Sequence, residues 1–163
     1  MKYPASQKNT ASAAMRRGTV QIGLALACLL VSPACRADCF DDAAAFHHVN
    51  PLILRAIALV ESRGNSNAIN KNSNGSYDLG MMQINSIHLP ELARYGLDRK
   101  DLLDACKNVY TGAWILRQNM DRYGNTWNAI GAYNASTPEY RRRYAARVQE
   151  MVTRLILAGR DAG

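Results

Sequence analysis

The residue best suited to chemistry in this sequence is Glu61, which ends an apolar segment just before a polar loop. Ile53, Ile57 and Val60 recur at helical spacing before it, so its carboxyl group is expected beside the buried face of a helix. The negative end of the helix dipole and apolar neighbours both favour the protonated carboxyl group, which a general acid needs near neutral pH. The alternative is an ordinary surface glutamate in a last helical turn, and position alone favours that alternative.

Other kinds of catalytic site lack the residues that they need. His47 and His48 are adjacent and point apart on a helix, and no paired-cysteine or His-x-x-x-His spacing occurs. We therefore interpret these two residues and His88 as structural or surface histidines. The sequence also lacks the Gly-x-Ser-x-Gly motif of many serine hydrolases and any glycine-rich phosphate-binding loop. We expect no metal ion and no cofactor.

The chain begins with a predicted export signal. Residues 20–31 are apolar but too short to span a bilayer comfortably, basic residues precede them, and small residues follow. This pattern predicts a signal peptide over residues 1–37, cleaved after Ala37, and one domain over residues 38–163 without a stable membrane anchor. Translation from Met15 instead of Met1 would give a more typical signal.

Charge and cysteine content change once the predicted signal is removed. Five of the 20 basic residues and none of the 13 acidic residues lie in residues 1–37, so the net charge falls from +7 to +2. This near-balance gives no reason to expect nucleic acid as a partner. Two cysteines leave with the signal, and Cys39 and Cys106 are then the natural disulfide pair of an exported protein. Two free buried thiols are the alternative.

The remaining pattern predicts mostly helices. We expect helices over residues 38–48, 51–62, 105–123, 127–133 and from Pro138 onward. Asn50 and Pro51 are typical of a helix start, and Asp98 with Asp101 is typical of a capping pair. Residues 63–78 are rich in asparagine and glycine and predict turns, with a small hairpin around Asn74-Gly75 as one arrangement. The arginines of the last helix are interpreted as a solvent-exposed face.

Three short motifs occur in order along the chain. Glu61-Ser62 is followed about twenty residues later by Gly80-Met81-Met82-Gln83-Ile84-Asn85, and then by Ala132-Tyr133-Asn134. Together they resemble the signature of the lysozyme-like lytic transglycosylases of the SLT family. More narrowly, the chain is similar to the small invasion-type and conjugation-type members that accompany secretion and pilus machines. Met81 departs from the family pattern, in which leucine is commoner.

The resemblance implies a mainly α, lysozyme-like (goose-type) helical domain with a small polar loop or hairpin. It also implies roles for single residues. Ser62 would hold the substrate beside Glu61, Gln83 and Asn85 would face the acetamido and hydroxyl groups of the sugar, and Tyr133 would hydrogen-bond Glu61 and orient it. Gly80 would permit a close approach of the backbone. Met81 and Met82 would form an apolar floor of the site, with a plain core role for one of them as the alternative. Asn134 would face the substrate or cap a turn.

The activity implied by the resemblance is cleavage of the β-1,4 bond between N-acetylmuramic acid and N-acetylglucosamine in peptidoglycan, with formation of a 1,6-anhydro ring. Glycosidases ordinarily use two carboxylates, and here only Glu61 is well placed, with Asp78 as the one nearby rival. The alternatives are a hydrolytic muramidase of the same fold and a catalytically silent peptidoglycan-binding scaffold. We expect a periplasmic monomer that acts on glycan strands and serves a secretion, conjugation or pilus apparatus.

Overall fold

The computed structural model describes residues 38–161, and the predicted signal peptide lies outside these residues. The longer helices lie where the sequence predicts them. In chain order the helices are α1 (Cys39–His47), α2 (Pro51–Ser62), α3 (Leu89–Ala93), α4 (Ala105–Tyr123), α5 (Trp127–Gly131) and α6 (Pro138–Asp161), with 3₁₀ turns η1 (Ser86–His88) and η2 (Asp101–Leu103). Three short strands, β1 (Ile69–Lys71), β2 (Tyr77–Leu79) and β3 (Ile84–Asn85), interrupt them.

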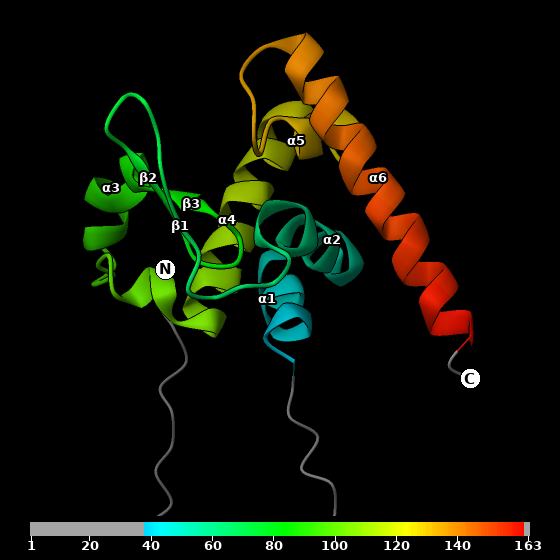
Figure 1. Ribbon diagram of the computed structural model, residues 1–163, viewed down its shortest axis with the longest axis horizontal. Helices are drawn as coiled ribbons and strands as arrows, with labels where there is room; N and C mark the ends of the chain where they lie inside the picture. Colours follow the sequence, from blue (N-terminus) through cyan, green and yellow to red (C-terminus); the bar gives the residue numbers. More distant parts are fainter. Residues whose placement is uncertain (1–37, 162–163) are drawn as a thin grey trace, which may run out of the picture. The chain divides into compact units, whose positions relative to one another are not determined.

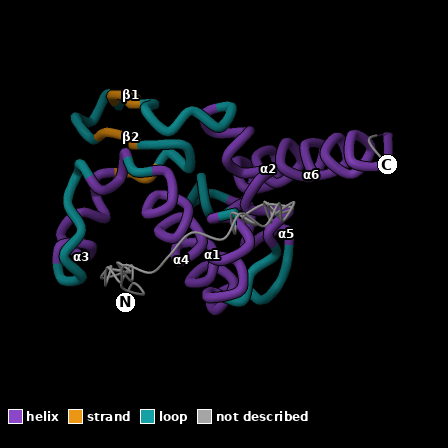
Figure 2. The backbone as a smooth tube through the Cα atoms, turned by 90° about the horizontal axis from the view of Figure 1, so that it is seen from below, coloured by secondary structure: helices purple, strands orange, loops and turns teal. Residues whose placement is uncertain are grey.

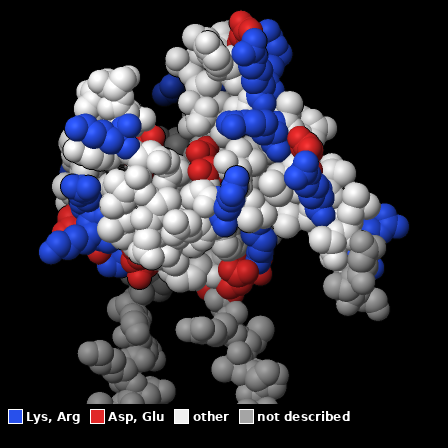
Figure 3. Space-filling view, viewed as in Figure 1, with Lys and Arg blue, Asp and Glu red and all other residues white. Residues whose placement is uncertain are grey.

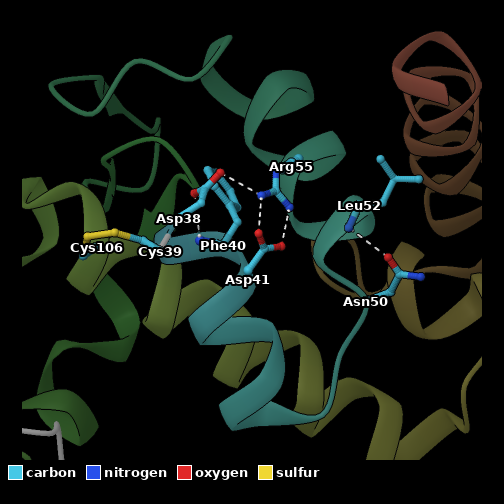
Figure 4. A network of polar contacts seen from close by, with 8 residues as sticks. All are labelled: Asp38, Cys39, Phe40, Asp41, Asn50, Leu52, Arg55 and Cys106. Atoms are coloured by element: carbon cyan, nitrogen blue, oxygen red, sulfur yellow. Dashed lines mark hydrogen bonds and ion pairs between the residues drawn. A yellow bond between two sulfur atoms is a disulfide. The ribbon is translucent and has the colours of Figure 1, made fainter. Parts of the chain in front are cut away.

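Local sequence signals explain where these elements begin. The Asn50 side chain accepts a hydrogen bond from the backbone N–H of Leu52 at 2.8 Å, and Pro51 is the first residue of α2, as predicted (Figure 4). Asp98 and Asp101 form the predicted capping pair, because each backbone N–H donates to the other's carboxylate.

The core is formed around α4, which packs against α1 and α5, while α6 packs against α2 and α5 (Figure 1). Four apolar residues that recur at helical spacing along α4 are buried: Val109, Ala113, Leu116 and Met120. In α2 the predicted buried face is only partly correct. Ile57 is fully buried, but Ile53 and Val60 are half-buried, and Leu54 takes the expected place of Ile53. The buried face is therefore rotated by about one residue.

The polar segment after α2 forms the predicted hairpin and one further strand. β1 and β2 pair antiparallel with Lys71 opposite Tyr77, and Gly75 takes a positive φ of 85° in the turn between them. β3, which was not predicted, adds to the other edge of β2, with Asp78 opposite Asn85. Figures 1 and 2 both place this sheet at one side of the domain and α6 at the other. The sheet holds the loop of residues 80–83 between β2 and β3.

A disulfide and an ion-pair cluster hold the start of α1. Cys39 is bonded to Cys106 of α4, with 5.3 Å between their Cα atoms, which confirms the predicted pairing. Arg55 of α2 contacts the carboxylates of Asp38 at 2.7 Å and Asp41 at 3.0 Å (Figure 4). Among residues 38–161 no helix carries an apolar stretch long enough to cross a membrane.

Candidate active site

A polar cleft of about 540 Å³ opens between the three-stranded sheet, the end of α2 that carries Glu61, and the turn after α5 that carries Tyr133. Figure 3 shows a hollow there between the sheet and α6, with acidic side chains in view. Of the residues predicted for the site, the cleft is lined by Glu61, Asp78, Gln83, Asn85, Tyr133 and Asn134. The structure therefore brings together parts of the chain that lie more than seventy residues apart.

Glu61 lies in the last turn of α2 and is half-buried. Burial is the main cause that raises the pKa of its carboxyl group, and the negative charge of Asp78 acts in the same direction. Three weaker effects oppose it: a hydrogen bond from Tyr144, the positive charge of Arg147, and the Asn134 amide. The predicted direction of the shift is thus confirmed, and Glu61 has the property that a general acid requires.

The residue that orients Glu61 is Tyr144 of α6, which the sequence analysis did not assign to the site. Its hydroxyl donates to Glu61 Oε1 at 2.6 Å. Tyr133 was predicted for this role, and that prediction is wrong, because the Tyr133 hydroxyl donates to the backbone carbonyl of Met82 at 2.9 Å. The two rings stack with 6.5 Å between their centroids, so Tyr133 instead supports both the loop and Tyr144.

The fully buried side chain of Asn108, on α4, holds the loop of residues 80–83 in place. Its amide group donates to the backbone carbonyls of Leu79 and Leu102 at 2.9 Å, and its carbonyl oxygen accepts from the Met82 N–H at 2.7 Å. The sequence analysis missed Asn108, because a single polar residue on a helix face gives no periodic signal. Asn108 and Thr111 are both polar residues on the buried face of α4, so polarity at a buried position does not single out Asn108 in the sequence.

Gly80 allows this close packing. It has a φ of 74°, and a Cβ atom there would lie 2.3 Å from both the Asn108 amide nitrogen and the Leu102 carbonyl oxygen. The predicted close backbone approach is therefore an approach to α4. A larger residue at Gly80 would be strained and would displace Asn108.

Two predicted substrate contacts have structural roles instead. The Ser62 hydroxyl donates to the Met81 carbonyl at 2.8 Å, which ties the end of α2 to the loop, and Ser62 is not among the cleft residues. Met82 is fully buried, and its side chain packs against the Cα of Gly112, so it is a core residue, as the alternative held. Met81 lies at a separate surface hollow beside Phe40 and Leu155. The predicted apolar floor of the cleft is therefore wrong.

The remaining predicted residues face the cleft as a set of fixed amides. Gln83 donates to the Gly80 carbonyl at 2.7 Å and accepts from Asn70. Asn85 donates to Asp78 Oδ1 at 2.6 Å, and Asn72 donates to Asp78 Oδ2 at 2.9 Å. Both carboxylate oxygens of Asp78 thus have an amide partner. Within residues 38–161 no group of histidine, cysteine or acidic side chains is arranged to hold a metal ion.

A mainly helical, lysozyme-like domain with a single shielded carboxyl group in a polar cleft defines the class of protein. Comparison with known families agrees: residues 38–151 match the transglycosylase SLT domain, and the chain belongs to this family, whose members are lytic transglycosylases.

Relatives of similar size support this assignment. An "X polypeptide" of Escherichia coli is 42% identical over 138 residues, which cover 80% of this chain and 82% of that protein. "Invasion protein IagB" of Salmonella typhimurium (strain SL1344) is 43% identical over 124 residues, 73% of this chain and 78% of its own. "Protein IpgF" of Shigella flexneri is 38% identical over 123 residues, 75% and 81% of the two chains.

Proposed function

We propose that this protein is a peptidoglycan lytic transglycosylase with Glu61 as its only catalytic carboxyl group. The observation that carries the proposal is the half-buried Glu61, whose pKa is raised by burial, in a cleft where the other carboxylate is already engaged by two asparagines. In the proposed reaction Glu61 protonates the oxygen that joins N-acetylmuramic acid to N-acetylglucosamine, and the bond from that oxygen to C1 breaks. The acetamido group of the muramic residue stabilises the positive charge that develops at C1.

In the second step Glu61 acts as the base. The 6-hydroxyl of the muramic residue attacks C1, its proton passes to Glu61, and a 1,6-anhydro ring closes. The proton lost in the first step is thereby recovered, and no water is consumed. Gln83, Asn85 and Asn134 line the cleft and offer amide groups to the hydroxyl and acetamido groups of the sugars.

A muramidase of the same fold is the second candidate, with Asp78 activating water. Asp78 lines the cleft, which favours this candidate, but its two oxygens accept hydrogen bonds from Asn85 and Asn72. An oxygen that already accepts a hydrogen bond is less available to take a proton from water, and the charge of Asp78 also contributes to the raised pKa of Glu61.

Mass spectrometry of the muropeptides released from purified peptidoglycan separates these functions. We expect products with 1,6-anhydro ends from the unaltered protein and none from Glu61→Gln. Reducing ends that disappear in Asp78→Asn would identify a muramidase. No release beyond the Glu61→Gln level would identify a catalytically silent scaffold.

We also propose that the protein acts in the periplasm and opens the wall locally for a secretion, conjugation or pilus apparatus. The similarity to a protein named for invasion supports this setting, and the predicted signal peptide supports export. Fractionation of cells that express the full chain tests the location, with a mature protein that begins at Asp38 expected in the periplasmic fraction. Retention of the uncleaved chain in the cytoplasm would contradict the proposal.

A further inference from the structure

The active-site cleft continues into a second hollow of about 380 Å³. The two hollows share the wall residues Ile87, His88, Ile115, Tyr133 and Asn134, so a ligand that fills the cleft can extend directly into the second hollow. The far wall of the second hollow is formed by the end of α4 and the start of α6. No aspartate or glutamate lines it, whereas Glu61 and Asp78 line the first hollow.

Two arginines occupy this far wall, on either side of one tyrosine. The guanidinium of Arg141 lies 4.4 Å from the centroid of the Tyr123 ring, and that of Arg122 lies 6.0 Å from it. Arg141 is held in place by hydrogen bonds to the Ala135 carbonyl and to the Tyr123 hydroxyl, both 3.0 Å. Hydrogen bonds from Arg141 and Arg122 also lower the pKa of Tyr123. We call Arg122, Tyr123 and Arg141 the arginine subsite.

The positive charge of the arginine subsite is not neutralised by an acid. Within residues 38–161 neither Arg122 nor Arg141 forms an ion pair, whereas Arg143 and Arg154 of α6 each pair with a glutamate one turn away. Arg141 uses two of its five N–H donors in the contacts above, and the others are available to a ligand. A forked guanidinium group on a polar wall suits a carboxylate in particular.

We propose that the arginine subsite binds a carboxylate carried by a muramic residue of the glycan strand that occupies the cleft. This inference rests on the proposed function. Only every second sugar of peptidoglycan carries such a group, either as a free lactyl carboxylate or on the peptide stem that replaces it. A contact with one muramic residue would therefore set the register of the strand and determine which glycosidic bond lies beside Glu61.

Binding of defined tetrasaccharides to a Glu61→Gln protein, which cannot cleave them, tests this inference. Three ligands are compared by calorimetry: neutral chitotetraose, the alternating N-acetylglucosamine and N-acetylmuramic acid tetrasaccharide with free lactyl carboxylates, and the same sugar with short peptide stems. Adding Arg122→Gln is expected to weaken binding of a carboxylate-bearing ligand about tenfold, the usual effect of one charged hydrogen bond, and to leave chitotetraose unchanged. An effect limited to one charged ligand identifies the lactyl or the stem carboxylate as the source.

Arg142→Gln is the matched control, because Arg142 is the neighbour of Arg141 on α6, is exposed, and lines a different hollow beside Trp127. It removes the same charge and should leave all three affinities unchanged. Equal affinities before and after Arg122→Gln, or an equal loss with Arg142→Gln, would overturn the inference. Cleavage of peptidoglycan by the unaltered protein, measured in parallel, shows separately whether the proposed function holds.

Discussion

At the scale of single residues, the state of Glu61 depends on opposing contacts. Burial and Asp78 favour the protonated carboxyl, whereas Tyr144, Arg147 and Asn134 favour the charged form. A residue that alternates between acid and base needs both states to be accessible, and this balance provides them. The three motifs that begin with Glu61-Ser62 pointed to Glu61 in the sequence, but nothing there identified Tyr144 as its partner. That contact joins residues 83 positions apart, and no local pattern encodes it.

Tyr144→Phe tests how Glu61 is held. The Tyr144 hydroxyl lowers the pKa of Glu61, so its loss should raise that pKa further. Because the first step needs protonated Glu61, the loss of activity at high pH should move to higher pH. We also expect kcat to fall by about tenfold or more, since the carboxyl group loses a charged hydrogen bond that orients it. The pH profile of kcat/KM measures the shift.

Tyr140→Phe is the control, because Tyr140 is on the same helix and is 61% exposed. It should leave the profile unchanged. A high-pH limb that stays in place or moves to lower pH in Tyr144→Phe would contradict the assigned role.

His47 is a second residue whose setting has a measurable consequence. It is 7% exposed, and its Nε2 atom has no hydrogen-bond partner within residues 38–161. Burial, followed by the charge of His48, lowers its pKa to about 4. The unfolded chain, with a histidine pKa near 6.5, therefore binds more protons than the folded one between these values.

The free energy of unfolding should consequently fall as pH decreases from about 6.5 to 4, by about 2 kcal/mol from this one group. Urea titrations at pH 7 and pH 4.5 measure the difference, which should shrink in His47→Gln and persist in His48→Gln. An equal pH dependence in all three proteins would show that His47 does not contribute.

At the scale of elements, the sequence was most informative where a local signal decides the structure. The start of α2 at Asn50-Pro51 and the whole of α4 follow from capping residues and apolar periodicity, and both are confirmed. The β1–β2 hairpin follows from its turn residues. β3 does not, because two residues have no recognisable period and are held by pairing with β2. The role of Ser62 was also missed, and the role of Met82 was left between a cleft floor and the core, since the sequence does not show which way a side chain at or next to a loop points.

Asn108→Ala tests whether α4 holds the loop of residues 80–83. The substitution removes three buried hydrogen bonds and leaves two carbonyls and one N–H of the backbone without their partner. We expect the free energy of unfolding to fall by about 3 kcal/mol, and activity at permissive temperature to fall as well, since Gln83 and Asn85 depend on this loop. Chemical denaturation measures the first effect and release of muropeptides the second.

Asn125→Ala, in the exposed segment after α4, is the matched control and should change stability by less than about 0.5 kcal/mol. If Asn108→Ala were as mild, the loop would have to be held by its own turns and by the sheet.

At the scale of the whole described domain, the proposed substrate cleft and the contacts that hold α1 in place are formed by different parts of the fold. The cleft and the arginine subsite lie between the sheet, α4 and the start of α6. The start of α1 is held by two kinds of contact (Figure 4). Ion pairs join Arg55 of α2 to Asp38 and Asp41, and a disulfide joins Cys39 to Cys106 of α4. Exposed ion pairs of this kind contribute little individually. Of these contacts at the start of α1, the disulfide is therefore expected to contribute most to the stability of the fold.

Cys39→Ser tests that expectation. The disulfide joins residues 67 positions apart, and closing a loop of that length stabilises a fold by roughly 4 kcal/mol on the chain-entropy estimate. For a domain of this size the midpoint of thermal unfolding in oxidising buffer should fall by about 10 °C or more. Adding a reductant should lower the midpoint of the unaltered protein by a similar amount and leave that of Cys39→Ser unchanged. An equal midpoint for the two proteins in oxidising buffer would mean that Arg55 and the packing of α1 against α4 hold this end of the chain without the bond.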